Sequence, residues 1–277
     1  MSGFSPEWLA LREPVDHRSR SSEMGQALAA RFAARREIDV VDLGCGTGSN
    51  LRGTAPMLPD SQRWVLVDYA DDLLAAARQT LTQWADTAAD DGDALALSKG
   101  GKRITVRFQR ADLSRDLDAA LGIKPDLVTA SALFDLCSVA FIKSFARAVS
   151  NRRAVFYTAL TYNGIQRWVP RQPSDNAMIA AFHAHQMTDK GFGVSAGPSA
   201  PVHLADAFQM SDYNVLEGDS PWRLDAADRA LVSELATGFA RAARETGKVD
   251  AKTVDAWSRM AHTGAEVGHT DTLAVPT

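Results

Sequence analysis

Between residues 38 and 162, short apolar runs alternate with stretches of helical periodicity. The apolar runs predict five strands, at residues 38–43, 63–67, 104–108, 126–130 and 154–159. Apolar residues at three- and four-residue spacing predict a helix after the second strand, with Leu74, Ala77, Leu81, Trp84 and Ala88 on one face. A second helix is predicted around residues 139–149. This alternation is typical of an α/β protein with a mostly parallel sheet and helices on both faces.

The pattern changes beyond Tyr162. Residues 163–201 are rich in Pro, Gly, His and Asn, with one short helical stretch near 177–185. A strand is predicted at 213–216, helices at 226–245 and 251–260, and a last strand at 270–275. The stretch before residue 38 is partly helical, with Met24, Leu28, Ala29 and Phe32 on one face. Residues 90–102 contain Gly92, Gly100 and Gly101 and predict a mobile loop.

We therefore expect one domain over residues 1–277. It would comprise a helical arm (1–37), a core (38–162), an insertion that covers the substrate (163–203) and C-terminal strands with a helical insertion (204–277).

Composition narrows the class of protein. Hydrophobic residues make up 45% of the chain and charged residues 23%, and the 34 acidic against 30 basic residues give a formal charge of −4. That balance disfavours a surface that binds nucleic acid. The only cysteines, Cys45 and Cys137, form no metal-ligand pattern, so we expect no metal site and a reducing compartment. With no secretory signal and no apolar run of membrane-spanning length, we expect a soluble cytoplasmic protein without a membrane partner, either a monomer or a homodimer.

The segment 40–49, VVDLGCGTGS, carries the strongest chemical signal. A hydrophobic strand leads directly into Gly44, Gly46 and Gly48. Glycines at such a turn let the backbone bend sharply and let a ligand approach it closely. The dinucleotide fingerprint GxGxxG would require a small residue such as Gly or Ala at position 49, where this chain has Ser.

Three aspartates accompany this loop. Asp42 precedes the glycines and can hold the loop or reach a ligand's amino group. Asp68 ends the second strand and can accept both hydroxyls of a ribose, and Asp112 ends the third and can accept from an adenine amino group. Three carboxylates suit a nucleoside that carries a cation better than a pyrophosphate. Taken singly, each aspartate is more commonly a helix cap or a surface charge, and Asp68 could cap the helix that begins near Asp71.

The motifs VDLGCGTG, VLVDYADDLL, RADL and PDLVTASALFDL, in this order, resemble those of the class I S-adenosylmethionine-dependent methyltransferases. The resemblance covers residues 38–162. It implies a Rossmann-like seven-stranded sheet with an antiparallel last strand, and it implies S-adenosylmethionine as cofactor with S-adenosylhomocysteine as product. By position, the three glycines would lie against the methionine moiety, Asp68 would bind the ribose and Asp112 the adenine. Residues 131–134 would line the floor beneath the sulfonium. The predicted cofactor site comprises Asp42, Gly44, Cys45, Gly46, Gly48, Asp68, Tyr69, Ala111, Asp112, Leu113, Ser131 and Ala132.

Methyl transfer from a sulfonium is a direct displacement, so a base is needed only when the acceptor must lose a proton. Asp135 is the acidic residue nearest the expected methyl group. It either orients the acceptor or caps the helix that begins near Ser138. Cys137 lacks the preceding proline of the cytosine C5 enzymes, and we interpret it as a packed cysteine.

The segment 183–193, HAHQMTDKGFG, contains His183, His185 and Lys190. On a helix, residues i and i+2 point apart, so this HxH pair does not suggest metal. The segment is either a lid that shapes the acceptor site, with both histidines as catalytic candidates, or a surface loop with an Asp189–Lys190 salt bridge. The substrate-binding candidates are His17, Arg18, Phe134, Tyr157, Tyr162 and Lys190. For His17 and Arg18 the alternative is a solvated lead-in to a helix, and for the aromatic residues it is core packing.

Four functions remain open at this point. The sequence favours methyl transfer to a small-molecule acceptor. A methyltransferase that acts on RNA or protein would show a basic or aromatic groove, and the chain has no Lys/Arg-rich tract. An NAD(P)-dependent Rossmann oxidoreductase is disfavoured by the GxGxG spacing and by Asp112. A non-catalytic protein that binds the nucleoside is the fourth.

Overall fold

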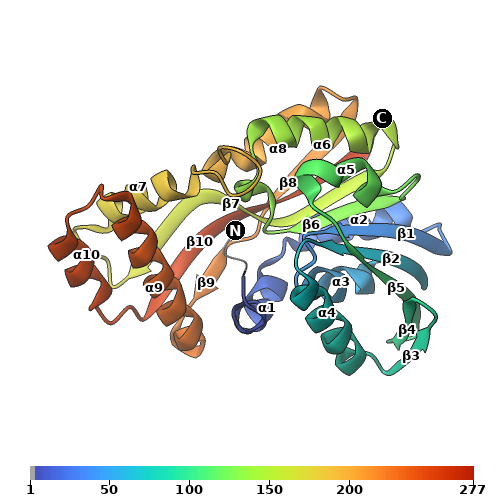
Figure 1. The fold of residues 1–277 in the computed structure, drawn as a ribbon, viewed down its shortest axis with the longest axis horizontal. Coiled ribbons are helices and arrows are strands. Elements are labelled where there is room, and N and C mark those ends of the chain that lie inside the picture. Colours follow the sequence, from blue (N-terminus) through green and yellow to red (C-terminus); the bar gives the residue numbers. More distant parts are fainter. Residues whose placement is uncertain (1–3) are drawn as a thin grey trace.

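The computed structural model describes residues 4–277. Its centre is a twisted sheet in the order β3-β4-β5-β2-β1-β6-β7-β10-β8, with β9 paired to β10 (Figure 1). The strands are β1 (Glu37–Leu43), β2 (Ser61–Asp68), β3 (Thr87–Asp91), β4 (Ala94–Lys99), β5 (Lys102–Arg110), β6 (Leu127–Ser131), β7 (Val155–Val169), β8 (Tyr213–Asp219), β9 (Trp222–Leu224) and β10 (Gly264–Pro276).

Seven of these strands form the predicted Rossmann-like sheet. Neighbouring strands from β5 to β7 are parallel, and β10 is antiparallel to β7 and to β8. The expected fold, with an antiparallel last strand, is confirmed. Because the carboxyl ends of β1, β2, β5 and β6 share one edge, the loops that follow them meet there.

Helices cover both faces of this sheet. On one face lie α2 (Ser22–Phe32), α3 (Ser49–Thr54) and α4 (Asp71–Trp84), and on the other lie α5 (Leu113–Leu121), α6 (Val139–Asn151) and α8 (Ala200–Gln209). Each layer buries the periodic apolar positions of its helices, such as Leu28 of α2 and Leu81 of α4 on the first face and Phe145 of α6 on the second. The helix α8 is absent from the sequence-based prediction.

The glycine-containing stretch 90–102 forms a hairpin where a mobile loop was expected. Gly100 and Gly101 have φ of +55° and +83° and form the two-residue turn that connects β4 to β5. Two left-handed residues in a row match the twist of a hairpin, which explains why the glycines are needed. A second correction concerns Ala88: α4 ends at Trp84, and Ala88 is exposed in β3, so it does not belong to the helix face.

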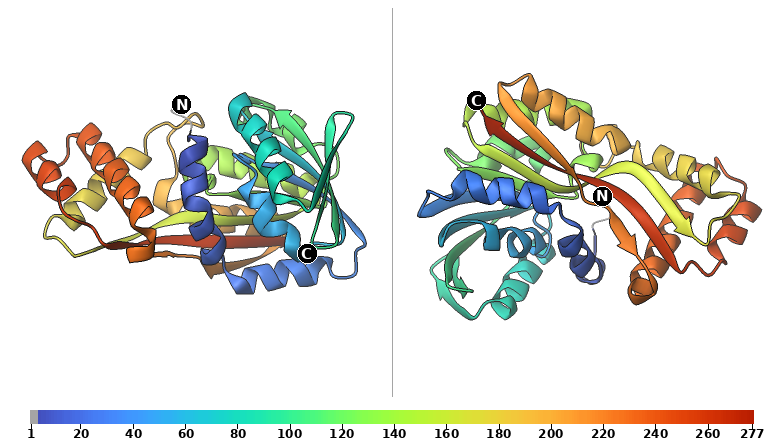
Figure 2. Two further views of the ribbon diagram at one scale, coloured as in Figure 1. Left: turned by 90° about the horizontal axis from the view of Figure 1, so that it is seen from below. Right: turned by 180° about the vertical axis from the view of Figure 1, so that it is seen from behind.

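The strands β7 and β10 extend well beyond the predicted 154–159 and 270–275. Buried Gln166 and Trp168 alternate with exposed Ile165, Arg167 and Val169, a period of two that the polar residues disguise in the sequence. The outer halves of both strands, with β9, carry a helical lobe of α7 (Asp175–Gln186), α9 (Arg229–Thr246) and α10 (Ala251–Ser258). Figures 1 and 2 show this lobe standing off one end of the sheet.

The helix α1 (Pro6–Ser19) contacts β9 and α9 and lies between the lobe and the α3–α4 side of the core (Figure 1). Ser5 caps it by accepting from the Trp8 N–H at 3.2 Å. The arm therefore reaches the edge of the sheet where the motif loops meet. Among the described residues, no helix is both long enough and apolar enough to cross a bilayer.

Candidate active site

The glycine loop connects β1 to α3 in a conformation that demands glycine. Gly44, Gly46 and Gly48 have φ of +63°, +52° and +78°, a region that L-residues with a Cβ seldom adopt. Leu9 of α1 lies against the loop, 3.0 Å from the position that a Cβ on Gly46 would take. Without Cβ atoms, the glycines let a ligand come close to the loop backbone. The arm lies over the loop where Leu9 contacts it.

Asp68, at the end of β2, anchors this loop. Its Oδ2 accepts from the Gly46 N–H at 2.9 Å, and its Oδ1 accepts from the Ala70 N–H at 3.1 Å. The carboxylate does not form a side-chain cap on α4, whose N-cap residue is Ala70. Because a carboxylate offers about four acceptor positions, Asp68 keeps free capacity for a ligand's hydroxyls.

Asp42 lies beneath the loop and is fully buried. The Nδ2 of Asn50 donates to its Oδ1 at 2.7 Å, whereas Oδ2 has no hydrogen-bond partner within residues 4–277. Burial raises the pKa of Asp42 to about 7, opposed by the Asn50 hydrogen bond and the Arg20 charge and reinforced by the Asp68 charge. Burial also raises the pKa of Cys45, so only the backbone of that residue is available to a ligand.

The third aspartate, Asp112, is a helix cap in the structure, and its contact with an adenine stays a prediction. Asp112 caps α5 by accepting from the Ser114 N–H at 3.0 Å, and the Ser114 hydroxyl lowers its pKa. It stands at the same edge of the sheet as Asp68, because the Ala111 N–H donates to the Asp68 carbonyl at 3.0 Å. Tyr69 is half exposed beside Arg110, and Leu113 is buried in the core, which leaves only its backbone available.

At the end of β6 lie residues 131–134, whose place beneath a sulfonium stays a prediction, and of which Phe134 is fully buried. Ser131 and Ala132 are partly exposed, and Ala132 has a φ of +51°. Leu133 lies 3.3 Å from the position of a Cβ on Gly44. The end of β6 and the glycine loop are therefore in contact, as adjacent parallel strands require.

Asp135, in the short helix Phe134–Leu136, is buried, and its charge acts on Tyr162 of β7 while that of Arg12 in α1 acts on it. Ser138, rather than Asp135, caps α6, through the Phe141 N–H at 3.1 Å. Burial raises the pKa of Asp135 to about 6, and the Arg12 charge opposes that rise. Burial also raises the pKa of Tyr162, and the Asp135 charge adds to this effect.

Tyr162 of β7 and His183 of α7 are joined, with 2.9 Å between the Tyr162 hydroxyl and His183 Nε2. Burial lowers the pKa of His183, which favours the neutral imidazole. This contact connects the predicted insertion at residues 163–203, which contains α7, to the sheet. Asp135, Tyr162 and His183 together are the polar group that we consider for the acceptor site.

Arg12, Asp16 and His269 were not among the candidates taken from the sequence. Arg12 forms an ion pair with Asp16 at 2.8 Å and lies 5.1 Å from the ring centre of Trp222, whose Nε1 donates to Asp16 at 3.0 Å. His269 of β10 packs against Trp222, and burial, with the Arg12 charge, lowers its pKa to about 3. These residues come from distant parts of the chain, and no local motif marks them.

Burial contradicts two of the predicted substrate contacts, Phe134 and Tyr157, whereas His17 and Arg18 stay predictions. Phe134 is fully buried and packs edge-on against Phe156 in the second core layer. Tyr157 is fully buried and its hydroxyl donates to Asp271 at 3.3 Å. Arg18 is half exposed and ion-paired with Asp228. His17 contacts the start of α3, with its Nε2 3.0 Å from the Ser49 carbonyl.

The segment 183–193 matches the lid interpretation in one part and the surface-loop interpretation in another. As helix geometry predicts, His183 and His185 point apart, and His185 pairs with Glu245 of α9 at 2.9 Å, a contact that lends no support to its predicted catalytic role. Asp189 accepts from the N–H groups of Gly191 and Gly193 and forms a turn, in place of the expected salt bridge with Lys190. Phe192 packs on Phe141 of α6 and holds this turn beside the site. The role of Lys190 in substrate binding stays a prediction. Cys137 is fully buried, as expected of a packed cysteine.

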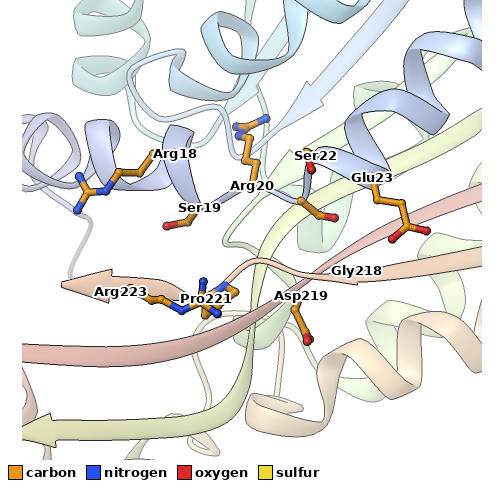
Figure 3. A pocket seen from close by; sticks show the side chains of 10 residues that line it. Arg18, Ser19, Arg20, Ser22, Glu23, Gly218, Asp219, Pro221 and Arg223 are labelled. Carbon is orange, nitrogen blue, oxygen red and sulfur yellow. The ribbon is translucent and has the colours of Figure 1, made fainter.

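A polar cavity of about 600 Å³ lies on another side of the arm, between residues 18–23 and the β8–β9 segment (Figure 3). Arg18 and Arg223 line it from opposite sides. Arg20 also lines it, but its side chain points away from the segment that carries Gly218 and Pro221. The residues of the glycine loop do not line this cavity.

No protein-family model and no curated protein sequence matches the chain. Solved structures do resemble it. A candidate methyltransferase from Bacillus halodurans is 11% identical, with 92% of this chain and 100% of that chain covered and a TM-score of 0.53. A cyclopropane-fatty-acyl-phospholipid synthase-like protein from Lactobacillus casei is 13% identical, with 95% and 98% covered and a TM-score of 0.53. A cyclopropane synthase from Mycobacterium tuberculosis is 11% identical, with 98% and 94% covered and a TM-score of 0.52.

At such low identity these likenesses concern the fold. They agree with the sheet order described above, in which β10 lies antiparallel between β7 and β8. The chain has the class I, Rossmann-like fold of the S-adenosylmethionine-dependent methyltransferases.

Proposed function

We propose that this protein transfers a methyl group from S-adenosylmethionine to a small-molecule acceptor by direct displacement. One observation carries the proposal: a left-handed glycine loop is tied to the carboxylate of Asp68 at the carboxyl edge of a methyltransferase-type sheet. The remainder of the site is consistent with a ligand that combines a nucleoside and a cation.

The residues at this edge fit that cofactor. Asp68 would accept from the ribose hydroxyls, Asp112 and the half-exposed Tyr69 lie where the adenine would bind, and the glycines leave room against the backbone. The free Oδ2 of Asp42 is a buried acceptor that lacks a donor, and a ligand's ammonium group would supply one. By contrast, the pyrophosphate of NAD would place further negative charge beside Asp42 and Asp68.

When bound, S-adenosylmethionine supplies an activated methyl group on a sulfonium. The chain's own contribution is to align the acceptor and to exclude water. Asp135 is the group available to take a proton, because a carboxyl with a pKa of about 6 is mostly ionised at neutral pH and is still basic enough to act. The Tyr162–His183 pair is placed to hold an acceptor's polar group beside it.

A small acceptor is supported by how the site is covered. Leu9 of α1 lies over the glycine loop, and the turn around Phe192 is docked on α6 beside the end of β6. A long nucleic acid or protein chain would have to displace one of these covers. The formal net charge of −4 and the two buried, unpaired cysteines are consistent with a cytoplasmic enzyme that acts on metabolites.

Transfer of label from S-adenosylmethionine with a tritiated methyl group tests this proposal. The protein is incubated with a bacterial extract separated into small-molecule, RNA and protein fractions, and Asp68→Asn serves as the inactive control. We expect label in the small-molecule fraction with the wild type alone. Label that appears only in RNA or in protein would contradict the proposed acceptor class, and no transfer to any fraction would contradict the proposed activity.

A further inference from the structure

A buried polar chain leads from the arm to the underside of the glycine loop. Arg20, between α1 and α2, donates through Nη2 to Asn50 Oδ1 at 2.9 Å and through Nη1 to Thr54 Oγ1 at 2.9 Å. Asn50 then donates through Nδ2 to Asp42 at 2.7 Å and lies 3.1 Å from Thr129 Oγ1. One positive charge is thus linked to one buried carboxylate through a single amide.

The direction of that amide depends on Arg20. A guanidinium only donates hydrogen bonds, so it fixes the oxygen of Asn50 toward itself and the NH₂ group toward Asp42. If the amide turned over, two donors would face each other at Arg20 and two acceptors would face each other at Asp42. Such hydrogen-bond chains in a low-dielectric interior reinforce one another.

The packing around Arg20 is built for the guanidinium. A Cβ on Gly53 of α3 would lie 2.9 Å from the Arg20 Cζ, so a larger residue there would displace the guanidinium from this position. Glycine inside a helix costs about 1 kcal/mol relative to alanine, and this position accepts that cost to admit the guanidinium. Figure 3 shows Arg20 turned away from the β8–β9 segment.

Few charges act on Asp42. Arg20 is the positive group and Asp68 of β2 the negative one, and Cys45 of the loop stays a neutral thiol because burial raises its pKa. Asn50 of α3 and Thr129 of β6 face Asp42 with neutral groups. Loss of Arg20 would therefore leave Asp42 next to Asp68 with no opposing charge from these groups.

We propose that Arg20 is a positioning residue which, through Asn50, orients the carboxylate of Asp42 beneath the glycine loop so that Asp42 can bind the cofactor's ammonium group. The inference rests on the proposed function, since the ammonium belongs to S-adenosylmethionine. It assigns to the arm a role in cofactor affinity that lies outside the motif loops.

The test combines two measurements on the full chain. Carboxyl ¹³C NMR follows the ionisation of Asp42 without ligand, and calorimetry follows S-adenosylhomocysteine binding from pH 6 to 8.5. In the wild type, whose Asp42 pKa is about 7, affinity should rise across this range as the carboxylate forms. In Arg20→Met we expect the Asp42 midpoint to rise by roughly one pH unit and affinity near pH 7 to fall by about fivefold.

The pH dependence separates this role from a structural one. The ratio of variant to wild-type affinity cancels the ligand's own ionisation, and we expect the deficit to shrink at high pH, where Asp42 is ionised in both proteins. Arg20→Lys should restore part of the affinity. Arg223→Met, which removes another arginine from the same cavity, should behave as the wild type.

Gly53→Ala provides a second variant in case Arg20→Met does not fold. Alanine favours the helix but displaces the guanidinium, so it should reproduce the raised Asp42 midpoint with the charge still present. An unchanged midpoint in both variants, or a deficit that is constant with pH, would overturn the inference while leaving the proposed function intact. A wild type that binds no S-adenosylhomocysteine would instead overturn the proposed function, and this inference with it.

Discussion

The glycine-loop edge of the sheet and the helical lobe on the outer halves of β7 and β10 are held together by different forces. At the edge, charged side chains and left-handed backbone dominate: Asp42, Asp68 and Arg20 each form hydrogen bonds with named groups, and the Oδ2 of Asp42 is left without a partner within residues 4–277. In the lobe, Trp168, Phe239 and Trp257 pack with ring centres about 5 Å apart. The contacts at the edge thus suit ligand binding, whereas the contacts in the lobe mainly stabilise the fold.

This difference predicts that substitutions at the edge change binding and catalysis, and that substitutions in the lobe change stability. The two regions are joined at the Tyr162–His183 contact, where α7 reaches β7. Variants in each region can therefore show how far binding and catalysis depend on residues other than those that determine stability.

The largest effect is expected from Asp135→Asn. If Asp135 removes a proton from the acceptor, the variant should lose about 10² to 10⁴ in kcat. Because burial raises the pKa of Asp135 to about 6 and the base is the carboxylate, wild-type kcat/KM should rise with pH through about 6 and then level off. The variant's profile should be flat there. Steady-state kinetics with the labelled acceptor measures both, and an unchanged profile would limit Asp135 to orientation.

Trp257→Ala should lower the free energy of unfolding by about 3 to 5 kcal/mol, because it empties a buried site and leaves Asp175 without its indole donor. Denaturant titration measures the loss. Affinity for S-adenosylhomocysteine should change less than about twofold under native conditions. A large loss of affinity in this folded variant would mean that the lobe and the edge are coupled more strongly than their separate contacts indicate.

Gly46→Ala should weaken S-adenosylhomocysteine binding by about tenfold, since the left-handed φ of +52° costs a Cβ-bearing residue about 1 to 2 kcal/mol and Leu9 lies 3.0 Å away. Gly238→Ala is the matched control in the lobe. It lies within α9 with nothing near its Cβ position, and it should raise stability by up to about 1 kcal/mol without changing affinity. Equal effects of the two variants on binding would contradict the comparison.

The smallest effect is expected from His185→Ala. Its pair with Glu245 is partly exposed, so stability should change by less than about 1 kcal/mol and kcat should not change. His183→Ala, two residues earlier, should lower kcat, because His183 contacts Tyr162 beside Asp135. Kinetics on the two variants compares a side chain that faces the site with one that faces α9.

The sequence predicted the edge far better than the lobe. The glycines, Asp68 and Asp112 stand at the ends of consecutive strands, so a local pattern and the rules of parallel sheets are enough to bring them together. Arg12, Trp222 and His269 meet only because α1, β9 and β10 come together in three dimensions. No local sequence pattern predicts such a contact.

Errors in the sequence-based account have physical causes. Tyr157 and Phe134 were expected at the acceptor, but strand and turn positions with aromatic side chains are most often core, and both are fully buried. Arg20 lies among other charged residues of the arm, and nothing local distinguishes it as the one that reaches the buried Asn50. Gly53 opposite Arg20 was the available clue, although a lone glycine in a short helix does not reveal its partner.

The most direct test of the central claim, that the glycine-loop edge is a cofactor site for S-adenosylmethionine, is calorimetric titration of the wild type and Asp68→Asn with S-adenosylmethionine, S-adenosylhomocysteine and NAD. We predict one-to-one binding of both sulfur nucleosides, no binding of NAD, and a loss of about 100-fold in the variant, whose amide cannot accept both ribose hydroxyls and the Gly46 N–H. Binding of NAD alone, or nucleoside binding that is unchanged in the variant, would contradict the account.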